Sequence, residues 1–194
     1  SMGIFDRNIE PLRYDGNMRN RVIIEISVFL CGMVVMIFEI LGSRILGPYL
    51  GTSIIVWTSV IGVVLASLSL GYFLGGQWAD RTPQIKTLSL IIFFAAFSIG
   101  ITVLIKEDLL LFFSNTLWGL KMNALLVSVL LFFPANVFLG MVSPYAVMLS
   151  LRSLRETGVT VGYLYALSTI GSIAGTFLSG FYLIPLFGTN LLLM

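Results

Sequence analysis

Long apolar segments with almost no charge follow one another along this sequence, and they limit its fold more than any other feature. A helix needs about 20 mostly apolar residues to cross the ~30 Å of hydrocarbon in a bilayer. Segments of this length predict five membrane-spanning helices, at about 22–41, 54–74, 87–105, 124–151 and 163–187. The last two ranges are long for a perpendicular span, so we expect tilting or kinks at Pro134, Pro144 and Pro185.

Composition supports the same class of protein. Hydrophobic residues make up 58% of the chain and charged residues 10%, whereas soluble domains carry about 25% charged residues. The net charge of +2 is too small to indicate a nucleic-acid partner, and the sequence has no histidine and a single cysteine, Cys31. We therefore expect an all-α bundle in a lipid bilayer, without a metal or a cofactor.

The ends of the chain carry further expectations. Residues 1–21 should form an N-terminal tail before the bundle at 22–194, with Ser1 and Met2 left over from cloning. The first apolar segment is too long for a signal peptide and no small-residue cleavage site follows it, which favours a retained helix. Residues 189–194 look like the beginning of a sixth span.

Basic residues predict the orientation, because cytoplasmic loops carry an excess of Lys and Arg. Eight of the 11 basic residues fall on the N-terminal side of the predicted bundle: Arg7, Arg13, Arg19, Arg21, Arg81, Lys86, Arg152 and Arg155. The opposite side has Arg44, Lys106 and Lys121. We therefore expect a multi-pass protein of a prokaryotic plasma (inner) membrane, with its N-terminus in the cytoplasm.

The longest predicted connection, 106–123, allows two interpretations. Apolar side chains such as Leu109, Phe112 and Leu117 lie among polar residues in it, and Trp118 is of the type found at headgroup level. The connection is either an amphipathic stretch lying in the outer interface or an outward extension of the neighbouring helices.

Small residues recur at four-residue spacing in two predicted helices, and such stripes let helix backbones approach closely. The stripes are Ser67, Gly71 and Gly75 in the second helix and Gly171, Gly175 and Ser179 in the fifth. These helices would correspond if the chain comprised two three-helix repeats, as in many transporters. Simple packing explains the stripes equally well.

Several charged and polar residues within the apolar segments are candidates for ligand binding or gating. Glu39 and Arg44 flank an expected helix break at Gly42, where they would form either a structural ion pair or part of a ligand site. Asp80 and Arg81 end the second helix, where they would close a cytoplasmic gate or simply end the helix. The remaining candidates are Tyr72, Asn136, Tyr163 and Tyr165.

Several sequence blocks resemble the membrane region of spermidine-synthase-like proteins, over most of residues 30–188. The blocks are Glu39–Arg44, Gly51–Ser53, Trp57–Gly62, Leu70–Tyr72, Gly75–Arg81, Phe133–Pro134, Gly140–Pro144, Gly162–Ser172 and Gly180–Gly188. The resemblance implies a bundle similar to half of a major facilitator superfamily transporter, placed before a cytoplasmic polyamine aminopropyltransferase domain. The Gly75–Arg81 block also resembles the gate signature of that superfamily, although only Lys86 matches the rest of its basic pattern.

The catalytic part of that family has no counterpart here, since the sequence lacks a glycine-rich strand–helix turn and a carboxylate cluster. The first hypothesis is therefore a membrane anchor for an aminopropyltransferase, which would be either a following domain or a separate subunit. The second is a transporter, or half of one, for polyamines or another small cation, with a homo-oligomer completing it. The third is an assembly or sensing subunit of another membrane protein.

Overall fold

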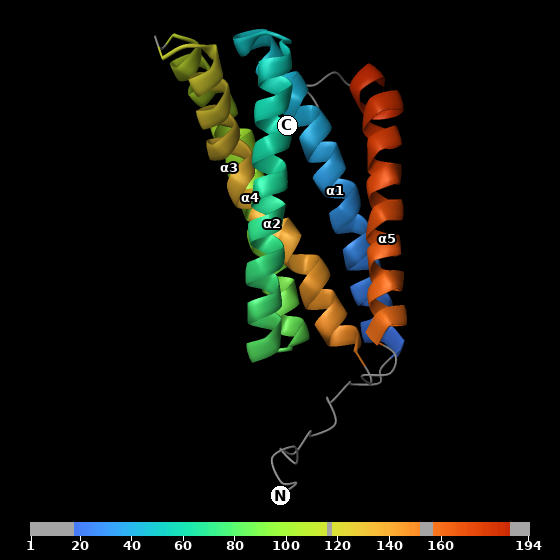
Figure 1. Cartoon of the computed structure of the whole chain (residues 1–194). Coiled ribbons are helices and arrows are strands. Elements are labelled where there is room, and N and C mark those ends of the chain that lie inside the picture. Colours follow the sequence, from blue (N-terminus) through green and yellow to red (C-terminus); the bar gives the residue numbers. More distant parts are fainter. Residues whose placement is uncertain (1–17, 116–117, 152–156, 187–194) are drawn as a thin grey trace, which may run out of the picture.

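The computed structural model describes residues 18–115, 118–151 and 157–186, and its regular structure is entirely helical within those ranges (Figure 1). The helices are α1 (Met18–Leu50), α2 (Ile54–Arg81), α3 (Ile85–Ser114), α4 (Leu120–Ser150) and α5 (Thr157–Phe177), and α5 continues into the π-helical turn η2 (Leu178–Leu183). Together with η2 and one more turn, the last helix spans Thr157–Leu186. All five are long and apolar enough to cross a bilayer, which confirms the predicted helical bundle.

Every helix is longer than the apolar segment that predicted it, because helical structure continues into the more polar residues at its ends. This difference decides between the two interpretations of the connection at 106–123. Since α3 continues to Ser114 and α4 begins at Leu120, the interpretation as an amphipathic interfacial stretch is wrong and the helix extension is correct. Two glycines with positive φ, Gly51 (φ 82°) and Gly119 (φ 85°), allow the tight turns that precede α2 and α4.

The prolines do not interrupt the helices in which they lie. Pro134 and Pro144 are inside the continuous helix α4, and Pro48 is inside α1. Pro185 lies in the last helical turn, directly after the π-helical turn of η2. Of the tail expected at 1–21, residues 18–21 belong to the first turns of α1, and residues 1–17 fall outside the described residues, as does the expected start of a sixth span at 189–194.

Helix α4 forms the centre of the bundle and contacts all the other helices. Its closest neighbours are α2 and α3, whereas α5 packs mainly against α1. In Figure 1 the green and teal α2 and the red α5 stand on either side of the blue α1. The main helix pairs are therefore α2 with α4 and α5 with α1.

The two small-residue stripes explain why these pairs are so close. A Cβ atom built on Gly71 would collide with the backbone carbonyl oxygen of Val137, and one on Gly75 would lie 2.6 Å from the Met141 carbonyl oxygen. On the other side of the bundle, Cβ atoms on Gly171 and Gly175 would collide with the carbonyl oxygens of residues 29 and 33. Each stripe thus lies directly against the backbone of its partner helix.

The outward surface is apolar, as expected for a surface that faces lipid. Large hydrophobic side chains are more than half exposed on α1, α2, α3 and the fifth span, and Leu104 of α3, for example, is 79% exposed. Examples are Ile26, Leu65, Phe73, Phe93, Phe97, Phe112, Ile170 and Phe181. In water, an apolar surface of this kind would cause aggregation, whereas in a bilayer it is solvated by lipid tails.

Candidate functional site

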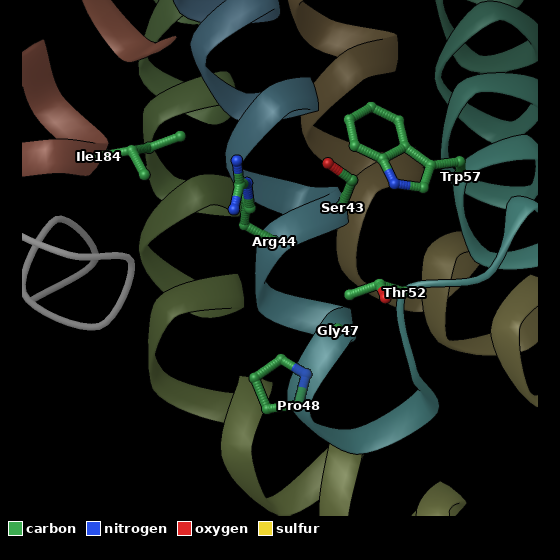
Figure 2. A pocket seen from close by; sticks show the side chains of 7 residues that line it. All are labelled: Ser43, Arg44, Gly47, Pro48, Thr52, Trp57 and Ile184. Carbon is green, nitrogen blue, oxygen red and sulfur yellow. The ribbon is translucent and has the colours of Figure 1, made fainter. Parts of the chain in front are cut away.

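A pocket of about 620 Å³ lies at the end of the bundle where α1 leads into α2. Its lining residues come from the last turns of α1, the turn that follows, the first turn of α2 and the last turn of the fifth span: Ser43, Arg44, Gly47, Pro48, Thr52, Trp57 and Ile184 (Figure 2). This volume is within the range of small-molecule sites, about 300–1,000 Å³.

Hydrogen-bond donors are concentrated in this pocket. In Figure 2 the Arg44 side chain lies between Ile184 on one side and Ser43 with the Trp57 indole on the other. The Ser43 hydroxyl donates to the Ile40 carbonyl oxygen at 2.9 Å, so its oxygen can still accept a hydrogen bond. The guanidinium of Arg44 and the indole N–H of Trp57 donate to no group in the described part of the chain.

The expected pair of Glu39 and Arg44 does not form. Helix α1 is continuous from Met18 to Leu50, so the predicted break at Gly42 is wrong. Gly42 instead makes room for the ring of Phe132, which a Cβ atom at this position would approach to 2.7 Å. At about 100° per residue, Glu39 and Arg44 point about 140° apart on the helix, and no ion pair joins them.

Tyr72, Tyr163 and Tyr165 lie on the surface of the bundle. Tyr72 is on α2 and the other two are on α5, and α2 and α5 are not in backbone contact. The three side chains are exposed, at 43%, 49% and 44% respectively. These candidates are therefore open to a ligand or a neighbouring molecule, but they lie on two helices that do not pack together.

Polar side chains inside the bundle mostly bond to nearby backbone. Asn136 is fully buried and its amide nitrogen donates to the Phe132 carbonyl oxygen at 2.9 Å, while its side-chain oxygen has no partner within the described ranges. Thr102 donates to the Leu131 carbonyl oxygen at 2.7 Å and so ties α3 to α4. The donor groups of Asn136 and Thr102 are thus satisfied by helix backbone, whereas the Asn136 side-chain oxygen finds no partner among the described residues.

At the opposite end of the bundle, Asp80 and Arg81 are exposed and form no ion pair with one another. The connection that follows them is held by Tyr145 of α4, a residue that the sequence interpretation missed. Its buried hydroxyl donates to the carbonyl oxygen of Thr82 and accepts from the backbone N–H of Gln84 at 3.2 Å. The only signal was a tyrosine at an otherwise apolar position late in the fourth helix.

No group of three or more metal-ligating side chains exists among the residues that the structure describes. Glu25, another acid in an apolar segment, lies beside Arg21 and forms a surface ion pair with it at 2.9 Å. The features left as candidate sites are therefore the pocket at Arg44, the exposed tyrosines Tyr72 and Tyr165, and the connection held by Tyr145.

Comparisons with protein-family models, with curated proteins and with solved structures find no match. The class of the protein consequently rests on its own fold. Five long apolar helices, packed through glycine stripes and covered by exposed hydrophobic side chains, define a multi-pass α-helical membrane protein.

Proposed function

We propose that this chain is the membrane-anchoring module of a spermidine-synthase-like protein, which holds a polyamine aminopropyltransferase at the cytoplasmic face of the membrane. The sequence blocks that resemble this family are one support. The observation that carries the proposal is the extensive apolar core formed by the described residues of the bundle. Its core consists of apolar side chains, and buried polar groups such as Ser67, Ser128 and Thr102 bond to neighbouring carbonyl oxygens.

An anchor needs this kind of interior, because a tightly packed bundle is stable and positions whatever is attached to it. A transporter operating as a single copy would need polar side chains that lack partners within the protein and face a pathway. In the described residues, the pocket lined by Arg44 lies at one end of the bundle, and the buried hydroxyl groups of Ser67 and Thr102 donate to carbonyl oxygens, whereas the buried side-chain oxygen of Asn136 has no partner.

The test is an activity measurement on membranes. Membranes containing the full natural gene product should transfer the aminopropyl group of decarboxylated S-adenosylmethionine to putrescine, giving spermidine and methylthioadenosine. Membranes containing only residues 1–194 should not, because this sequence has no carboxylate cluster to carry the reaction. Absence of transfer by the full product, or transfer found only in the soluble fraction, would contradict the anchor.

One observation favours a second candidate, a half-transporter for polyamines or another small cation that functions as a pair of copies. Tyr72 on α2 and Tyr165 on α5 are exposed, and aromatic faces attract ammonium groups. Glu39, half-buried in α1 and without an ion-pair partner among described residues, would supply a negative charge. Proteoliposomes should then accumulate labelled spermidine, and Glu39→Gln should abolish uptake; uptake equal to that of empty liposomes would exclude this candidate.

A further inference from the structure

The pocket at the α1–α2 end of the bundle is lined by a positively charged side chain, Arg44, that has no acidic partner among the described residues. Arg44 is the one charged residue lining it, and none of the described carboxylates lies within ion-pair distance of its guanidinium group. The Trp57 indole N–H is a second free donor on the opposite wall. Two donors facing one cavity without a protein acceptor form a site for an anion.

Guanidinium groups favour phosphate over most anions, because their planar fork donates two parallel hydrogen bonds to a pair of phosphate oxygens. Ser43 adds a hydrogen-bond acceptor. Because its hydroxyl group donates to the Ile40 carbonyl oxygen, its own oxygen can accept a hydrogen bond from a hydroxyl group of a ligand. The pocket is therefore suited to a phosphate group whose other substituent carries a hydroxyl.

The position of the pocket along the helices identifies the surroundings of that phosphate. Arg44 is six residues before the end of α1 and Trp57 three residues after the start of α2, so both lie within about 9 Å of a helix end. Tryptophan and arginine near helix ends are typical of the headgroup level of a bilayer. Ile184 and the Trp57 ring also give the pocket apolar walls.

We propose that this pocket binds the phosphate group of an anionic phospholipid, with Arg44 as the charge partner and Trp57 as a second donor. A headgroup of this kind brings a phosphate to headgroup level and places acyl chains against the exposed apolar surface below it. Free inorganic phosphate shares the same chemistry, and the experiment below separates the two sources. The proposal is independent of any catalytic partner of the bundle.

The test uses Trp57 as the reporter. A protein with Trp78→Phe and Trp118→Phe retains Trp57 as its single tryptophan, since the sequence has three. This protein, purified in mild detergent, is titrated with phosphatidylglycerol carrying brominated acyl chains, which quench a nearby indole. Brominated phosphatidylcholine, whose ammonium group cancels the phosphate charge, is titrated in parallel.

The matched variants are Arg44→Gln, Arg44→Lys and Lys121→Gln. Lys121 is an exposed cation at the beginning of α4 and does not line the pocket, so it controls for general surface charge. Each variant is first shown to melt like the parent. A basic residue near the membrane surface contributes about 1 kcal/mol to the binding of anionic lipid, which corresponds to about a fivefold preference.

We expect phosphatidylglycerol to half-saturate quenching at about fivefold lower concentration than phosphatidylcholine. Arg44→Gln should remove this preference, Arg44→Lys should retain part of it, and Lys121→Gln should leave it unchanged. Equal quenching by the two lipids in the parent, or a preference that survives Arg44→Gln, would overturn the proposal. Displacement of the brominated lipid by sodium phosphate at constant ionic strength would support phosphate recognition and assign the site to the free anion.

Discussion

Tyr145 illustrates what one side chain contributes in a bundle whose helices are held mainly by apolar contacts. Its ring is completely buried in α4, yet its hydroxyl reaches two backbone groups of the connection between α2 and α3. The bond spans more than 60 positions of sequence. Tyr145 therefore couples the end of α2, with Asp80 and Arg81, to the central helix.

Replacing Tyr145 with Phe tests this role, because the change removes the hydroxyl and leaves the ring. Loss of hydrogen bonds of this type costs about 1–2 kcal/mol. We expect a lower melting temperature in detergent and faster trypsin cleavage after Arg81 and Lys86, which flank the released connection. Tyr163→Phe is the control, since Tyr163 is half exposed and bonds to no described group; equal effects of the two variants would contradict the role of Tyr145.

At Arg44 the sequence identified a residue that lines a pocket, but it predicted the wrong interaction partner. Arg44 was selected as a ligand-binding candidate, and it does line a pocket. Its partner was expected to be Glu39 because glycine often ends helices, but in a membrane Gly42 serves to admit the Phe132 ring. Sequence spacing cannot distinguish a glycine that ends a helix from one that allows a close approach.

At the scale of helices, the glycine stripes make a sharp comparison possible, because α2 has glycines on two different faces. Gly71 lies against the α4 backbone, whereas nothing lies within 4 Å of a Cβ atom on Gly62. Gly71→Ala should therefore force α2 away from α4 and lower the free energy of unfolding by about 1–3 kcal/mol. Gly62→Ala should change it by less than about 0.5 kcal/mol, as measured by denaturation in mixed micelles.

Helix α5 offers the same comparison independently. A Cβ atom on Gly171 would collide with the carbonyl oxygen of Phe29 in α1, whereas Gly162 has open space around it. We expect Gly171→Ala to destabilise the bundle by an amount similar to Gly71→Ala, and Gly162→Ala to be nearly neutral. If Gly162→Ala were as costly as Gly171→Ala, the face of α5 that packs on α1 would be assigned wrongly.

The sequence predicted that both stripes pack helices, but it could not say against which ones. Their partners depend on the three-dimensional order of the helices, which short connections do not determine in a five-helix chain. The pocket has the same origin, since it joins Ser43 and Trp57, which are close in sequence, to the distant Ile184. Hydrophobic segments fix the number of spans, while tertiary contacts fix which faces meet.

At the scale of the whole molecule, the helix pairs have a simple relation. Exchange of α1 with α4 and of α2 with α5 converts the α2–α4 pair into the α5–α1 pair, and both pairs are formed through glycine stripes. This relation is expected of two repeats inserted in opposite orientations, because an odd number of spans precedes α4.

The basic residues predict the orientation of this molecule in the membrane, and this expectation gives the last prediction. Thr82, in the connection after α2, lies at the end where Arg81 and Lys86 are found, and Ser114 lies at the opposite end of α3. With Cys31 replaced by Ser, single cysteines at these positions report their side of the membrane. In intact cells, a membrane-impermeant maleimide should label Ser114→Cys and should label Thr82→Cys only after lysis.

Both positions are exposed in the structure, so a difference in labelling would reflect the membrane rather than burial. The expected pattern places the connection held by Tyr145 in the cytoplasm and the Arg44 pocket on the outer side, where it meets the outer headgroups. The reverse pattern would put that pocket in the cytoplasmic leaflet, which is rich in anionic lipid. It would also place the side of the membrane that carries the N-terminus outside the cytoplasm. A domain on that side could not be a cytoplasmic aminopropyltransferase, and the proposed anchor would be wrong.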